Sequence, residues 1–185
     1  DSGFPKQGTR SVGVARQYSG TLGKVGNCQV GVFLGYASSR GHALVDRRLF
    51  LPAQWSDDRE RCAAAGVPEH VHHETKPTLG LALLAAARKR GQLQSRWVTA
   101  DAGYGEVPAF RDALDADGWW YVLEVPSTTR VFVAAAQAAV PAWSGRGRRP
   151  TRPRLVDGEP TAVTVAAVGA TVSTWETLTV AEGAQ

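Results

Sequence analysis

The chain has 185 residues, of which 43% are hydrophobic, and it carries 21 lysines and arginines against 17 aspartates and glutamates. This length and apolar content suffice for a buried core, and no apolar run reaches the roughly 20 residues of a membrane-spanning helix, which excludes a helical membrane protein. The composition predicts one α/β domain with an appendage. Because the chain begins with Asp1 and contains no methionine, we interpret it as a piece of a longer protein.

The net charge of +4 comes from one short tract. Five arginines lie between residues 144 and 155 with no acidic residue among them: Arg146, Arg148, Arg149, Arg152 and Arg154. A local basic tract favours a polyanionic partner such as nucleic acid, and a solvated loop is the alternative.

The N-terminal part predicts a glycine-rich segment followed by a hairpin. Residues 1–26 contain six glycines and keep several cations near the surface. From residue 27 to 38 apolar side chains alternate, beginning with Cys28, which predicts a strand with one apolar face. Residues 39–41 predict a tight turn, and residues 43–51 a second strand that returns antiparallel. Cys28 and Cys62 form no metal-binding spacing, which is consistent with a reducing compartment.

A short helix is predicted over residues 57–65, with Ser56 as its N-cap and Gly66 as its stop. Three histidines follow in the stretch HVHHE: His70, His72 and His73. They could bind a metal ion, or they could belong to a surface loop, since no fourth ligand stands at a suitable spacing.

A strand–helix–strand pattern surrounds Asp101. A helix is predicted from the cap Thr75 to Gly91, a strand up to Ala100, a second helix over residues 107–117, and a buried strand over residues 119–125. Sites in open α/β sheets form at the carboxyl ends of strands, so Asp101 is a candidate catalytic carboxylate. The alternative is that it caps a turn.

Beyond residue 126 the sequence changes character, and we predict a boundary near residue 127. Runs rich in threonine and valine at residues 162–168 and 171–180 predict a hairpin.

Four stretches resemble one known family: DSGFPKQGTRSVGVARQYSGTLGKVGNCQV, RLFLPAQW, TKPTLGLAL and ADAGYG. They are similar to DDE transposases of bacterial insertion sequences, specifically the group of DDE superfamily endonucleases. The resemblance is dense over residues 1–127 and looser beyond. It implies an α/β, ribonuclease-H-like mixed sheet flanked by helices, with 1–127 as the front half of the catalytic core. Residues 128–185 would be part of a β-rich insertion with a basic Pro/Gly/Arg loop.

The resemblance also implies catalytic, metal-binding aspartates, carried over to Asp1 in DSG and Asp101 in ADAGYG. Carboxylates of this kind hold Mg²⁺, or Mn²⁺, which activates the attacking oxygen and stabilises the leaving one. The family's third acid is a glutamate in a stretch of the form Arg-Trp-x-Ile-Glu, and none of five glutamates has these surroundings: Glu106, Glu124, Glu159, Glu176 and Glu182. We therefore expect a transposase fragment that is inactive alone.

The expected partner is double-stranded DNA, as transposon ends and target. Lys6, Arg16 and Lys24 match family positions near the first acid and are predicted to contact phosphates, although packing or loop solubility would explain them equally. The five arginines of the basic tract are further candidates. Tyr104 could stack on a base or cover the strand end. We also expect the full-length protein to form a homo-oligomer and to be cytoplasmic, with no membrane association. Two alternatives remain: a non-catalytic DNA-binding remnant and a ribonuclease-H-like nuclease.

Overall fold

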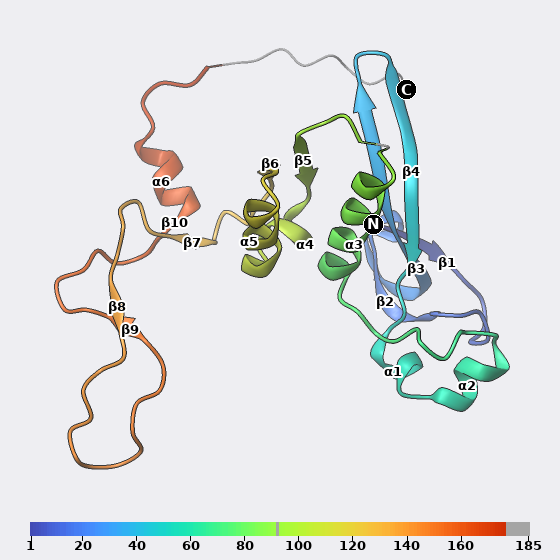
Figure 1. Cartoon of the computed structure of the whole chain (residues 1–185), viewed down its shortest axis with the longest axis horizontal. Coiled ribbons are helices and arrows are strands. Elements are labelled where there is room, and N and C mark those ends of the chain that lie inside the picture. Colours follow the sequence, from blue (N-terminus) through green and yellow to red (C-terminus); the bar gives the residue numbers. More distant parts are fainter. Residues whose placement is uncertain (92, 177–185) are drawn as a thin grey trace. The chain divides into compact units, whose positions relative to one another are not determined.

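The computed structural model describes residues 1–91 and 93–176 (Figure 1). The chain divides into two compact units, Asp1–Glu124 and the part that begins at Val125, and each is described by itself. Both contain helices and strands, so the predicted α/β class is confirmed at that level.

An antiparallel sheet forms the first half of the Asp1–Glu124 unit. Its strands are β1 (Ser2–Pro5), β2 (Ala15–Ser19), β3 (Lys24–Ser38) and β4 (Gly41–Leu49), with a short 3-10 turn, η1 (Gly20–Leu22), between β2 and β3. The long strand β3 pairs with all three others, and β3 and β4 form the predicted hairpin. Cys28, Val30 and Val32 are buried on one face of β3, which confirms the apolar face read from the alternation.

The next segment forms two short helices, α1 (Ala53–Ser56) and α2 (Arg59–Ala64). The predicted N-cap was wrong: Asp58 caps α2 by accepting a hydrogen bond from the Arg61 amide at 2.9 Å. Ser56 lies in α1, where its hydroxyl accepts from the His73 amide at 2.9 Å. Serine and aspartate are similar N-caps, so the sequence alone did not fix which one would begin the helix.

The predicted strand–helix–strand region follows. Helix α3 (Lys76–Lys89) begins at Thr75, whose hydroxyl caps the Thr78 amide. Strand β5 (Trp97–Ala100) leads into α4 (Ala102–Gly105), α5 (Pro108–Ala116) and β6 (Trp120–Leu123), and β5 and β6 pair in parallel. The expected burial of the last strand was wrong, because Trp120 and Val122 are 55% and 63% exposed. β6 is an edge strand with one open face.

The strands of this unit do not form the single mixed sheet that was expected. Gly31 of β3 pairs with Ser2 on one side and Leu49 on the other, so β1 and β4 lie on opposite edges of β3. Among the described residues, no strand continues beyond β1 along its edge of β3, and none pairs with the second edge of β5. Side chains of α3 connect the two sheets in one core, with Leu83 packed in a cluster that includes Val32 of β3 and Val98 of β5.

Both cysteines are free thiols and fully buried in this unit. Cys28 lies within β3, and burial raises the pKa of its thiol. Cys62 belongs to a second core cluster with Trp55, whose carbonyl its thiol contacts at 3.0 Å. Cys28 is therefore a core residue of the sheet.

The second unit contains four short strands and one helix. The strands are β7 (Arg130–Val131), β8 (Ala138–Ala139), β9 (Arg154–Leu155) and β10 (Val163–Thr164), and the helix is α6 (Val165–Thr171). The predicted hairpin was wrong, because β10 pairs with β7 and residues 165–171 are helical. Thr164 caps this helix by accepting from the Ala167 amide, and its alanines favour the helical state. Residues 177–180 of that prediction lie outside the described residues.

Candidate active site

Asp101 follows β5 directly, as the alternation predicted. It also caps α4, because its Oδ1 accepts a hydrogen bond from the Gly103 amide at 3.0 Å. The two interpretations of this residue are therefore compatible: the cap fixes the carboxylate while the residue remains exposed.

Asp1 directly precedes β1 and forms an ion pair with Lys76, the first residue of α3. The side chains of Lys76 and Asp1 are 30% and 21% exposed, so the pair is partly shielded from water. Lys76 lies in the stretch TKPTLGLAL, and no role for this lysine was predicted from the sequence. A lysine in the first turn of a helix carries no periodic signal, and only the fold shows its partner.

The two aspartates line one cavity of about 160 Å³. Val32, Leu83, Val98 and Tyr104 are among its apolar walls. The strands beside the two aspartates, β1 and β5, belong to different sheets. The cavity lies between β3 and β5 and receives one carboxylate from each side.

The Lys76 ammonium pairs with Asp1 and is influenced by the charge of Asp101. Burial lowers the pKa of Lys76, and the negative charge of Asp101 opposes that shift. Since Lys76 also pairs with Asp1, one cation is shared by two acids. The site therefore attracts positive charge, which is the property that a cation-binding centre needs.

Tyr104 forms a wall of this cavity and is buried. Its ring packs edge to face against Phe110 with centroids 5.5 Å apart, so the prediction that it covers the strand end is confirmed. Burial, followed by the charge of Asp101, raises the pKa of Tyr104 to about 12. The phenol thus stays neutral near pH 7 and serves as a structural wall.

A further carboxylate, Glu124, follows β6 beside Asp101. Ala100 and Leu123 are register partners in the parallel pair, and the Glu124 amide donates to the Ala100 carbonyl at 3.1 Å. Asp101 and Glu124 line a second cavity of about 370 Å³. Sequence reasoning set Glu124 aside because of its surroundings. Parallel pairing of β5 and β6 brings the carboxyl ends of both strands to the same level. A predicted parallel pair would therefore have indicated that Glu124 lies beside Asp101.

The donor chemistry of Asp1 and Asp101 fits a divalent cation, because carboxylate oxygens are the ligands that hard cations prefer. Within residues 1–91 and 93–176, no cluster of three or more histidine, cysteine or acidic side chains is arranged to hold a metal ion. Of the three histidines, His73 has a structural role: its Nδ1 lies 2.8 Å from the Leu51 carbonyl.

The predicted DNA-contacting residues are exposed but do not gather at this cavity. Lys6, Arg16 and Lys24 are exposed, and Arg16 lines a different pocket. The five arginines of the basic tract are exposed in the second unit: Arg146, Arg148, Arg149, Arg152 and Arg154. They take no part in the two ion pairs of the described residues, Lys76–Asp1 and Arg90–Asp46. Their charge remains available to a polyanion.

Comparison with known proteins identifies the family of the chain. Residues 1–185 match the family described as DDE superfamily endonuclease. No curated protein and no solved structure matches the chain. No helix of the described residues is long and apolar enough to cross a membrane. The match spans the whole sequence and includes both cavity aspartates, so the chain belongs to the DDE superfamily endonucleases.

Proposed function

We propose that this chain is part of a DNA transposase, in which Asp1 and Asp101 bind the divalent ion for DNA cleavage and strand transfer at insertion-sequence ends. The observation that carries the proposal is the cavity lined by both carboxylates, with a lysine ammonium paired to Asp1. Endonucleases of this superfamily act on DNA and generally use divalent metal ions. Mg²⁺ is the proposed ion, with Mn²⁺ as a substitute that has the same preference for oxygen ligands.

The residues of the chain have distinct parts in this proposal. Asp1 and Asp101 hold the ion, and the Gly103 amide fixes the Asp101 carboxylate. A bound divalent ion supplies activation of the attacking oxygen and stabilisation of the leaving oxygen. Lys76 balances the two negative charges when no ion is bound. Once the ion binds, the Lys76 ammonium can move to a DNA phosphate. The buried ring of Tyr104 excludes water from the part of the cavity wall that it forms.

The ribonuclease-H-like arrangement is part of the same proposal. Ser2 pairs antiparallel with Gly31, so a strand entering at Asp1 would run along the open edge of β3, beside the cavity that separates β3 from β5. Such a strand would join both sheets into one. The proposal further includes a cytoplasmic protein that acts on nucleoid DNA as a homo-oligomer, with Lys6, Lys24 and the basic tract on phosphates.

Adding Mg²⁺ or Mn²⁺ is expected to raise the melting temperature of the chain, because the ion binds the folded state preferentially. At ten times its Kd the ion adds about 1.4 kcal/mol of stability. For a chain of this size that corresponds to a rise of roughly 3–6 °C. Asp101→Asn should remove most of the rise while leaving the ion-free melting temperature nearly unchanged, since asparagine is an equally good N-cap.

The matched control is Asp112→Asn, which removes the same charge from an exposed position on α5. This variant should keep the full response to the ion. Differential scanning fluorimetry in chelator, Mg²⁺ and Mn²⁺ makes the comparison. An undiminished rise in Asp101→Asn would place the ion elsewhere and remove the central support for the proposal.

The isolated chain is expected not to nick supercoiled plasmid DNA in Mg²⁺, because two carboxylates hold the ion without a third protein ligand in the described residues. Agarose-gel assays of the pure chain measure this directly, with Asp101→Ala as the background. Nicking that disappears in Asp101→Ala would contradict the expected inactivity, and would show that the two aspartates suffice.

A further inference from the structure

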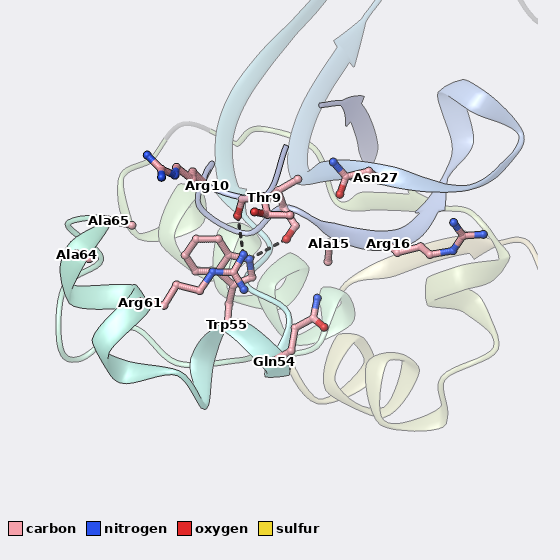
Figure 2. Close-up of a pocket in the computed structure, with 11 residues that line it drawn as sticks. Thr9, Arg10, Ala15, Arg16, Asn27, Gln54, Trp55, Arg61, Ala64 and Ala65 are labelled. Carbon is pink, nitrogen blue, oxygen red and sulfur yellow. Dashed lines mark hydrogen bonds between the residues drawn. The ribbon is translucent and has the colours of Figure 1, made fainter. Parts of the chain in front are cut away.

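A separate pocket of about 790 Å³ lies between the N-terminal segment and the helices α1 and α2 (Figure 2). We call it the Trp55 pocket. It shares no lining residue with the aspartate cavity. Its lining residues are Thr9, Arg10, Val14, Ala15, Arg16, Asn27, Gln54, Trp55, Arg61, Ala64 and Ala65.

The charge of this pocket is entirely positive. Arg10, Arg16 and Arg61 line it, and none of its lining residues is acidic. Arg10 and Arg16 are exposed, and neither takes part in the two ion pairs of the described residues. Several guanidinium groups around one concave surface favour an anion, and a planar guanidinium binds phosphate through two parallel hydrogen bonds.

One of these cations is held rigidly. The Arg61 guanidinium lies 3.7 Å from the centroid of the Trp55 ring, and its Nη2 donates to the Thr9 carbonyl at 2.6 Å. Trp55 is fully buried and donates its indole N–H to the Val14 carbonyl at 2.8 Å. Figure 2 shows the stacked pair at the centre of the pocket with both hydrogen bonds. A cation fixed in this way loses little conformational freedom when it binds a ligand.

The volume of the pocket exceeds that of a single anion, and a volume of this size is typical of sites for molecules larger than one phosphate group. Trp55 and Val14 are buried beneath the lining, so the accessible surface comes from exposed residues such as Arg10, Arg16 and Ala64. Asn27 is fixed by donating to the Lys6 and Gly8 carbonyls. The surface therefore suits a polyanion that places more than one phosphate along it.

Strand β1 connects the Trp55 pocket to the aspartate cavity. It is flanked by Asp1 and by Lys6, whose backbone amide donates to the carbonyl of the pocket residue Asn27 at 3.0 Å. An extended segment of this length spans roughly 16 Å, at about 3.3 Å per residue. Duplex DNA advances about 3.4 Å per step of one strand, so the span corresponds to about five base-pair steps.

We propose that the Trp55 pocket binds the phosphodiester backbone of duplex DNA, about five base-pair steps from the phosphate that reacts at the aspartates. This inference rests on the proposed function for the reaction at the aspartate cavity, while the binding itself requires no metal ion. The acidic residues of the neighbouring helices, Asp57, Asp58 and Glu60, are not among the lining residues, and Asp58 is engaged as the α2 cap.

The test adds one negative charge to the pocket without removing a contact. Ala64→Glu places a carboxylate on the lining, and Ala63→Glu places the same charge on the preceding exposed residue of α2, which does not line the pocket. Because both variants add the same charge to α2, a difference between them reports the pocket position rather than the net charge. Fluorescence anisotropy with a labelled duplex in chelator measures Kd for both variants.

We expect Ala64→Glu to weaken duplex binding roughly tenfold, which is about the loss of one charge-assisted contact. Ala63→Glu should leave the duplex Kd within about twofold of the unmodified chain. As a second variant, Arg10→Gln with Arg16→Gln should weaken binding further and lower the salt-dependence slope by about two, one for each lost phosphate contact. Its control is Arg40→Gln with Arg47→Gln, two exposed arginines of the β3–β4 hairpin.

Equal binding by both glutamate variants, together with an unchanged salt slope in Arg10→Gln with Arg16→Gln, would overturn the proposal. So would a loss confined to inorganic phosphate, used as a small-anion probe, with duplex affinity intact. Failure of the proposed function is seen separately, because Asp101→Asn changes the response to Mg²⁺ and should leave duplex binding in chelator unchanged.

Discussion

Replacing Trp55 by alanine is expected to lower the free energy of unfolding of the Asp1–Glu124 unit by about 4 kcal/mol, a typical cost of truncating a buried tryptophan. The side chain is fully buried in a cluster with Val14, Leu51 and Cys62. Its loss leaves a cavity, deprives the Val14 carbonyl of a donor, and removes the ring on which Arg61 stacks. Urea denaturation followed by circular dichroism measures the change.

Two further variants separate these contributions. Trp55→Phe keeps an aromatic ring under Arg61 but lacks the indole N–H, so it should cost less than Trp55→Ala. Trp175→Ala removes a tryptophan that is 73% exposed and should alter stability by no more than about 0.5 kcal/mol. Equal stability of Trp55→Ala and the unmodified chain would contradict the described packing of α1.

Replacing Gly105 by alanine is expected to cost about 3 kcal/mol, at the upper end of the usual range for an overpacked core. A Cβ atom at this position would lie 1.9 Å from the Glu124 carbonyl oxygen and 3.0 Å from the Leu123 Cβ. Backbone at β6 cannot rotate away as a flexible side chain would. Helix α4 would have to move from β6, and Asp101, which caps α4, would move with it.

The matched control is Gly20→Ala, since nothing lies within 4 Å of a Cβ at that position. This variant should unfold within about 0.5 kcal/mol of the unmodified chain. Melting in Mg²⁺ adds a second measurement, because displacement of Asp101 should also reduce the stabilisation by the ion. A Gly105→Ala chain as stable as the control would show that α4 and β6 are less tightly packed than described.

Local patterns predicted the parts of the fold that are determined locally. The alternation from Cys28 onward gave the β3–β4 hairpin, and Thr75 marked the beginning of α3. Asp101 was found at a strand end because the apolar run stops there and glycines follow. Each of these features depends on neighbouring residues along the chain, whose spacing the sequence records.

Features that depend on tertiary contacts were missed. Strand propensity depends on packing, so residues 165–171, which include part of the predicted hairpin, form a helix once Thr164 caps it. The hydrophobicity of Trp120 predicted burial, yet no element of the Asp1–Glu124 unit covers that face of β6. The Lys76–Asp1 ion pair and the stacking of Arg61 on Trp55 bring together residues from separate segments, so no spacing along the chain predicts them.

The two buried thiols make the chain its own reporter of unfolding. Cys28 and Cys62 are the two cysteines of the sequence; Cys62 lies in the cluster around Trp55, and Cys28 is buried within strand β3 of the sheet. A thiol reagent reacts with the thiolate, which burial disfavours at Cys28, so folded molecules are protected and opened ones are labelled. The rate of labelling at each cysteine therefore distinguishes local opening around Trp55 from opening of the sheet, with no added dye or engineered residue.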